Sequence, residues 1–168
     1  YTGGENVYEV DGDPIRVRWL ISNDGFNWQP HPDTNDGVVL EGGGSETALV
    51  HLDAGGIVAV VRNEGGDESG FGSKVCSAPA DQLGQWTCTP DPRKFDSPLL
   101  IRSGGHVWLT ARRHLAEDGH YDLARRDLTQ LEQYLFYQAK YWNAAKRCAI
   151  WIVDPIARTI DWMADLPS

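Results

Sequence analysis

The sequence predicts an all-β fold built from repeated four-stranded sheets, and three observations support this prediction. Eighteen Gly and nine Pro are spread along the 168 residues, which is typical of many short strands joined by tight turns. Seven Trp against a single Met favour strands over a helical bundle. The third observation is an internal repeat at an offset of fifty residues.

The repeat unit is a strand, a glycine turn and a second strand. Without a gap, 46–50 aligns with 96–100, and 57–62 aligns with 107–112. Each turn contains a Gly pair, and glycine tolerates the positive φ angles that hairpin turns require. Each copy is therefore predicted to form a β-hairpin whose second strand ends in Arg. The turns are Asp53-Ala54-Gly55-Gly56 and Ser103-Gly104-Gly105-His106.

A second pattern occurs three times: a strand runs into a turn that contains Asp, and a Trp follows. In the first copy, at 16–22, apolar and polar residues alternate as they do in a half-buried strand. Each copy predicts the third and fourth strands of a sheet. The copies are 16–22 with Asp24 and Trp28, 74–77 with Asp81 and Trp86, and 148–153 with Asp154 and Trp162.

In chain order, these patterns predict a β-propeller. Residues 1–29 supply part of one blade, 45–89 a complete four-stranded blade, and 96–114 with 147–163 a further blade. Propellers repeat such sheets radially about every 40 to 50 residues and close with about four to eight blades. About two and a half blades make 1–168 a single partial propeller domain. We expect another chain or missing segments to cover its open edges and close the ring.

The last blade is split by an insertion at 115–146, which is predicted to carry one helix near 129–144. Apolar residues recur there at helical spacing, and Thr129-Gln130-Leu131-Glu132 has the form of a capping box. Two roles remain open for this helix. It can pack against an apolar patch of the propeller, or it can form a lid over a binding site, since long insertions often carry function.

The segment Ser22-Asn23-Asp24-Gly25-Phe26-Asn27-Trp28 resembles the Asp box of sialidase-type propellers, with one residue missing between Asp and Gly. The resemblance implies a structural role for Asp24 and Trp28. The carboxylate accepts backbone N–H groups and holds the turn, while the indole packs between blades. Asp81 and Trp86 belong to a degenerate copy of the same motif.

A second segment, 45–52 with 60–63, resembles the sialidase region in which an Asn-Glu pair opens a strand and the next strand ends in Ala-Arg. In that family the Glu assists a tyrosine nucleophile, and the Arg belongs to a triad that grips the substrate carboxylate. By position, Glu46 takes the catalytic role and Arg62 binds substrate, because a guanidinium forks onto a carboxylate. An ion pair between Glu46 and Arg62 is the structural alternative.

Arg112 is the repeat equivalent of Arg62 and is predicted to bind substrate or to pair with Asp96. Other features of the family are not visible: the Arg-Ile-Pro segment, its acid/base Asp and a segment marking the nucleophilic tyrosine. The tyrosines of the insertion are predicted to pack around the helix more readily than to act as nucleophiles. They are Tyr121, Tyr134, Tyr137 and Tyr141.

The resemblance therefore implies a sialidase-like glycoside hydrolase that acts on terminal sialic acid or a related acidic sugar and needs no cofactor. The alternative is a non-catalytic propeller that binds glycan or protein, or a structural subunit of a larger assembly, because one fold serves many functions. No His or Cys spacing typical of zinc is present, and the acidic loops at 11–13 and 33–36 are predicted to be solvated turns.

The net charge and the cysteines indicate which partners and which cellular location the protein has. A formal charge of −9 repels polyphosphate, which argues against nucleic-acid binding. No apolar stretch approaches the roughly 20 residues that a membrane span needs. Cys76 and Cys88 fall on the predicted third and fourth strands of the complete blade, so a cross-strand disulfide is predicted. A disulfide is typical of a secreted or extracellular protein.

Overall fold

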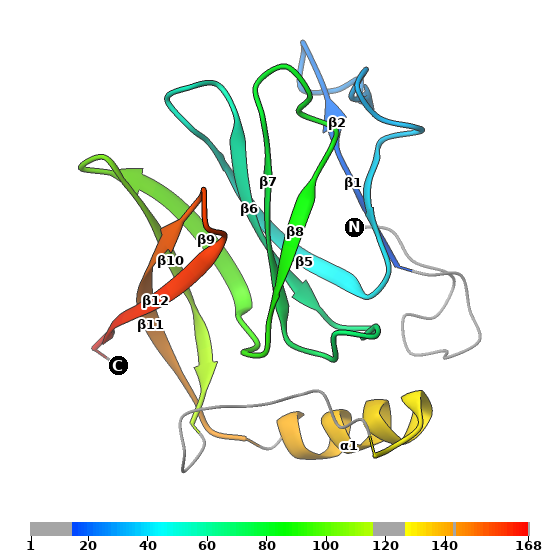
Figure 1. The fold of residues 1–168 in the computed structure, drawn as a ribbon, viewed down its shortest axis with the longest axis vertical. Coiled ribbons are helices and arrows are strands. Elements are labelled where there is room, and N and C mark those ends of the chain that lie inside the picture. Colours follow the sequence, from blue (N-terminus) through cyan, green and yellow to red (C-terminus); the bar gives the residue numbers. More distant parts are fainter. Residues whose placement is uncertain (1–14, 116–126, 143, 168) are drawn as a thin grey trace.

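The computed structural model describes residues 15–115, 127–142 and 144–167. Within these ranges the chain forms twelve strands and one helix (Figure 1). The strands are arranged in four antiparallel sheets. This confirms the predicted all-β class. The helix in the described part of the chain is not long and apolar enough to cross a membrane.

Two four-stranded sheets make up most of the molecule, and both have consecutive strands as neighbours. The central sheet starts and ends close to 45–89, the range predicted for the complete blade, and the second sheet starts and ends close to the predicted 96–114 and 147–163. The central sheet contains β5 (Gly44–His51), β6 (Ile57–Asn63), β7 (Ser73–Ala78) and β8 (Thr87–Asp91). The second contains β9 (Asp96–Ser103), β10 (His106–His114), β11 (Lys146–Asp154) and β12 (Thr159–Asp165).

The two repeat copies are both hairpins, but their register differs by one residue. Ala48 pairs with Val60 in the first hairpin, whereas Leu99 pairs with Thr110 in the second. The cause is the turn: only Gly104 and Gly105, at φ +61° and +78°, connect the second pair of strands, while the first loop is longer.

The register shows that the offset of fifty residues between the two repeat copies does not hold for both strands of the hairpin. If β6 and β10 are matched at an offset of fifty, then β5 and β9 match at fifty-one. Asp96 therefore corresponds to Ser45, and both are buried. Ser97, which is exposed, takes the position of Glu46.

The N-terminal region differs from the two blade strands predicted within 1–29. Its described part forms two short sheets, in which β1 pairs with β4 and β2 with β3. Together they form one two-stranded ribbon, interrupted by a loop at 31–37. The strand β4 was not predicted, and 1–14 lie outside the described residues. The four strands are β1 (Arg16–Arg18), β2 (Leu20–Ile21), β3 (Gln29–Pro30) and β4 (Val38–Glu41).

The core explains why Ile57–Val61 is an unbroken apolar run, since β6 is buried on both faces. Val58 and Val60 pack against the second sheet, which contributes Leu109 and Trp151. Ala59 and Val61 pack on the other side against the N-terminal ribbon. Because Leu109 of β10 corresponds to Ala59 of β6, each four-stranded sheet turns the same face towards the sheet that precedes it.

The predicted disulfide between Cys76 and Cys88 is confirmed. The two cysteines are directly opposed on β7 and β8. They pack beside Val61 and Trp86, between the central sheet and the N-terminal ribbon. Cys148, on β11, is an exposed free thiol.

The predicted helix is present as α1 (Gln130–Trp142), at the lower end of the molecule in Figure 1. Its capping box forms as expected: the carboxylate of Glu132 accepts the backbone N–H of Thr129 at 2.9 Å, and the Glu132 N–H donates to the Thr129 hydroxyl. Tyr134 and Tyr137 are buried against Phe71 of the loop after β6. These two tyrosines therefore pack the helix, while Tyr121 lies outside the described residues.

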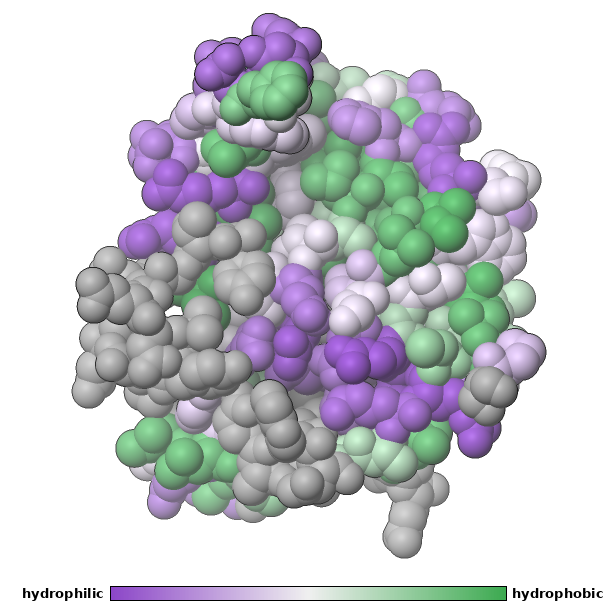
Figure 2. Space-filling view, turned by 180° about the vertical axis from the view of Figure 1, so that it is seen from behind, coloured by the Kyte–Doolittle hydropathy of each residue, from purple (hydrophilic) through white to green (hydrophobic). Residues whose placement is uncertain are grey.

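Figure 2 shows the opposite face of the molecule, where hydrophobic residues gather in the upper half and hydrophilic residues lie below them. The exposed large apolar side chains of β5 and β9 are Leu49, Leu99 and Ile101. On β9 these side chains belong to the face of the second sheet that is turned away from the core. That face is open in the described structure.

Candidate functional site

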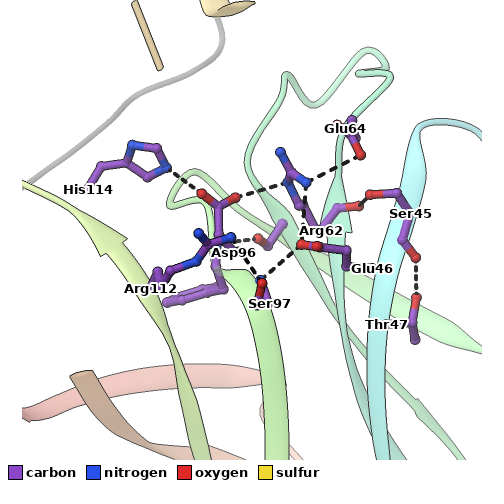
Figure 3. A network of polar contacts seen from close by, with 11 residues as sticks. Ser45, Glu46, Thr47, Arg62, Glu64, Asp96, Ser97, Arg112 and His114 are labelled. Atoms are coloured by element: carbon purple, nitrogen blue, oxygen red, sulfur yellow. Dashed lines mark hydrogen bonds and ion pairs between the residues drawn. The ribbon is translucent and has the colours of Figure 1, made fainter. Parts of the chain in front are cut away.

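A cluster of charged residues lies where the two hairpins meet, at the start of β5 and β9 and the end of β6 and β10 (Figure 3). An antiparallel hairpin brings the start of its first strand beside the end of its second. The strands β5 and β9 lie side by side, so two such ends come together. The cluster contains Glu46, Arg62, Glu64, Lys94, Asp96, Ser97, Arg112 and His114.

Arg62 is the centre of this cluster and contacts three carboxylates. Its Nη1 lies 3.3 Å from the Oε2 atoms of both Glu46 and Glu64. Its Nε lies 3.0 Å from Oδ1 of Asp96, an ion pair that is not aligned as a hydrogen bond. The side chain is 20% exposed. Two of its three nitrogens are thus already engaged by carboxylates of the chain itself.

Asp96 and His114 form a buried pair, with 3.0 Å between Nε2 and Oδ2. Burial lowers the pKa of His114 below its usual value, although the hydrogen bond to Asp96 opposes this shift. Burial would raise the pKa of Asp96, but His114 and the charge of Arg62 hold it below its usual value. The imidazole is therefore neutral at pH 7, and it donates its Nε2–H to the ionised carboxylate.

Lys94 is the second cation of the cluster and is only 6% exposed. Burial is the largest effect on its pKa and lowers it, together with the positive charge of Arg62, to about 8. The carboxylates of Asp96, Glu64 and Glu46 partly offset this shift. The ammonium group is charged at neutral pH but has lost much of its ordinary basicity.

Ser97 makes two hydrogen bonds in the cluster, one that connects the two hairpins and one within the second hairpin. Its backbone N–H donates to Oε2 of Glu46 at 2.9 Å, and its hydroxyl accepts a hydrogen bond from Nη2 of Arg112 at 3.0 Å. Glu46 therefore receives donors from both four-stranded sheets. The guanidinium of Arg62 contacts three carboxylates, and one of them also binds the imidazole of His114. These contacts join the two four-stranded sheets at the open ends of their first hairpins.

The structure brings the sequence-predicted residues Glu46 and Arg62 into contact and places Arg112 one residue away, through Ser97. Arg112 and Asp96 are opposite each other on the neighbouring strands β10 and β9. The guanidinium that contacts the Asp96 carboxylate is nevertheless that of Arg62. The cluster also contains residues that were not assigned to the site. The pattern Arg112-x-His114 on one strand, facing Asp96 on its neighbour, is the signal that could have identified the buried pair.

The Asp-box residues lie in turns away from this cluster: Asp24 between β2 and β3 of the ribbon, and Asp81 and Asp154 between the third and fourth strands of the two four-stranded sheets. Oδ1 of Asp24 accepts the N–H groups of Asn27 at 2.7 Å and Phe26 at 2.8 Å, and these bonds hold its pKa far below its usual range. Asp154 holds the corresponding turn of the second sheet in the same way, through the N–H groups of Ile156 and Ala157.

The remaining Asp-box residues differ from the expectation. Trp28 is 61% exposed and does not pack between sheets within the described structure. The degenerate Asp-box copy lies in the turn between β7 and β8 of the central sheet. This turn is held by two backbone hydrogen bonds, from the N–H of Gln82 to the carbonyl of Pro79 and from the N–H of Gln85 to the carbonyl of Gln82. Asp81 is exposed there, whereas Trp86 is half-buried and donates its Nε1–H to the carbonyl of Leu83 at 3.1 Å.

Across residues 15–115, 127–142 and 144–167, no group of three His, Cys, Asp or Glu side chains is arranged to hold a metal ion. The candidate site is therefore defined by its ion pairs and hydrogen bonds. Comparison of the chain with protein-family models, with curated proteins and with solved structures finds no match.

Proposed function

We propose that the chain is part of a sialidase-type β-propeller. Two features support this architecture. The four-stranded sheets have the same strand order and present the same face to the preceding sheet, as radially repeated blades do. Asp24, in the turn between β2 and β3, and Asp154, in the turn between β11 and β12, accept backbone N–H groups in the same way. Two blades and a ribbon do not close a ring, so further blades come from another chain or from other segments.

The proposed activity is hydrolysis of a terminal sialic acid or related acidic sugar from glycans. The observation that carries this proposal is the contact between Glu46 and Arg62, 3.3 Å apart on the hairpin that faces the next blade. Glu46 assists a tyrosine contributed from outside the cluster by accepting its proton. Arg62 binds the sugar carboxylate. Because Nη1 and Nε of Arg62 already contact carboxylates, the substrate must displace at least one of them.

The second candidate is a non-catalytic propeller that binds glycan or protein. The contacts of Nη1 and Nε of Arg62 with Glu46, Glu64 and Asp96 favour it, because an arginine that grips a substrate carboxylate needs free donors. In this case the cluster only joins two blades. The setting proposed for either function is secreted or extracellular, where the Cys76–Cys88 disulfide persists.

Release of a fluorophore from a sialoside by the intact protein separates the two candidates. Hydrolysis should fall about 100-fold or more in Glu46→Gln, which keeps both hydrogen-bond partners but loses the basic carboxylate. In Arg62→Lys the KM should rise, because lysine cannot fork onto a carboxylate. Arg102→Lys is the control, since Arg102 pairs with Asp53 at the opposite hairpin end.

If the folded wild-type protein releases no fluorophore, the hydrolase proposal fails. Binding of a sialylated glycan without its hydrolysis supports the second candidate instead. Equal activity in wild type and Glu46→Gln would also contradict the catalytic role, because the substitution leaves the fold contacts in place.

A further inference from the structure

A cavity of about 320 Å³ lies between the N-terminal ribbon and the central sheet. Its walls come from Arg18 and Trp19 of the ribbon, from Ser45, Thr47 and Leu49 of β5, and from Trp86 before β8. Glu46 lies between two of these β5 residues in the sequence but contacts Arg62 and Ser97, towards the second sheet. The strand β5 therefore separates the cavity from the charged cluster.

The cavity has an aromatic wall that is held in place by its neighbours. Trp19 stacks on His31 with ring centroids 4.6 Å apart, and Trp86 meets Trp19 edge-on at 6.3 Å. The Nε1–H of Trp86 donates to the carbonyl of Leu83, which fixes its orientation. Each positioned indole gives a ligand aromatic surface at little cost in side-chain entropy.

The polar groups of the cavity complement a polyhydroxylated ligand. The hydroxyl of Thr47 donates to the carbonyl of Ser45 at 2.9 Å, so its lone pairs remain for donors of a ligand. Nη1 of Arg18 is held by Asp36, and no hydrogen bond of Nη2 is seen among the described residues. The side chain is 31% exposed, so its outer N–H groups can donate to a ligand oxygen.

We propose that this cavity binds a single pyranose ring of a glycan. The C–H face of a sugar packs on an indole, its hydroxyls donate to Thr47, and its ring or acid oxygen accepts from Arg18. The volume lies near the lower end of the range for ligand pockets, which suits one ring rather than an oligosaccharide. No Asp or Glu lines the cavity, so a neutral or an acidic sugar is accepted. The site is separate from Glu46 and does not rest on the proposed hydrolysis.

Titration of the full chain with galactose, glucuronic acid and N-acetylneuraminic acid tests this site, followed by saturation-transfer NMR and tryptophan fluorescence. At least one sugar should bind saturably, with a Kd of about 1 mM or tighter. Thr47→Val should weaken binding about fivefold, the usual worth of one hydrogen bond, while Thr47→Ser retains it. Trp86→Phe should weaken it about two- to tenfold.

Two control variants keep the outcome specific to the cavity. Trp28→Phe alters an exposed indole outside the cavity, and Arg102→Lys alters an ion pair with Asp53 that is also outside it; both should bind sugar like the wild type. Circular dichroism establishes that each variant is folded. Absence of saturable binding by the folded wild type overturns the proposal. Binding that survives Thr47→Val and Trp86→Phe but is lost in Glu46→Gln also overturns it, and it assigns the sugar to the charged cluster instead.

Discussion

Arg62 shows how a single side chain at the end of a strand can join two sheets. It contacts Glu46 and Glu64 within the central sheet and Asp96 of the second sheet. With Lys94, two cations face three carboxylates. Removing the guanidinium would leave the buried Asp96 with only His114 and the nearby charge of Lys94, and breaking a buried ion pair typically costs about 3–5 kcal/mol. The same contacts that stabilise the sheet junction also restrict the access of any substrate carboxylate to Arg62.

The lowered pKa of Lys94 leads to a prediction about stability at alkaline pH. The folded protein releases this proton near pH 8, whereas the unfolded chain holds it up to about pH 10.5. Between these values the unfolded state binds more protons, so stability rises with pH; below pH 8 the penalty for burying the charge is fully present. The free energy of unfolding of the wild type, relative to Lys94→Met, should rise by up to about 3 kcal/mol across this window.

Urea unfolding of both proteins at several pH values between 6 and 10.5 measures this difference. Taking the difference removes the titration of tyrosines, which both proteins share. Between pH 6 and 7.5 the difference should be flat. A difference that stays constant up to pH 10.5 would show that Lys94 keeps an ordinary pKa in the folded protein.

At the level of elements, turn chemistry sets the differences between the two four-stranded sheets. The two-residue Gly104-Gly105 turn shifts the second hairpin by one residue, and this shift puts Asp96 at the position of Ser45. Asp24 and Asp154 accept backbone N–H groups in their turns, whereas the turn before Trp86 is held by backbone hydrogen bonds. In the central sheet, the Cys76–Cys88 disulfide ties the two strands that this turn connects.

The disulfide is therefore expected to stabilise the central sheet substantially. Replacing Cys76 and Cys88 together with Ala should lower the free energy of unfolding by about 3 kcal/mol, because the open loop regains conformational entropy in the unfolded state. Chemical denaturation under non-reducing conditions measures the loss. Cys148→Ser is the matched control and should change stability by less than about 0.5 kcal/mol, since Cys148 is exposed and unbonded. Equal stability of the double variant and the wild type would refute this role.

At the level of the whole molecule, local patterns predicted the elements better than their long-range contacts. The hairpins, the capping box at Thr129 and the disulfide depend on short-range signals and are confirmed. The strand β4 was missed because its pairing with β1 depends on a loop at 31–37 that interrupts the ribbon. The cluster around Arg62 was only partly predicted, since Asp96 and His114 enter it through a register that the turn length sets.

The second sheet offers a matched pair of leucines that tests the proposed stacking of blades. Leu109 is fully buried against the central sheet, whereas Leu99, on the neighbouring strand, faces the other way and is 55% exposed. In this chain, Leu109→Ala should cost about 2–5 kcal/mol of unfolding free energy, because it leaves a cavity between the sheets, and Leu99→Ala less than about 1 kcal/mol. Urea denaturation followed by circular dichroism measures both. If a further blade covers this face in the assembled protein, the cost of Leu99→Ala should rise there towards that of Leu109→Ala. Equal costs in this chain alone would show that the face is already covered, for instance by self-association, and would contradict an open blade.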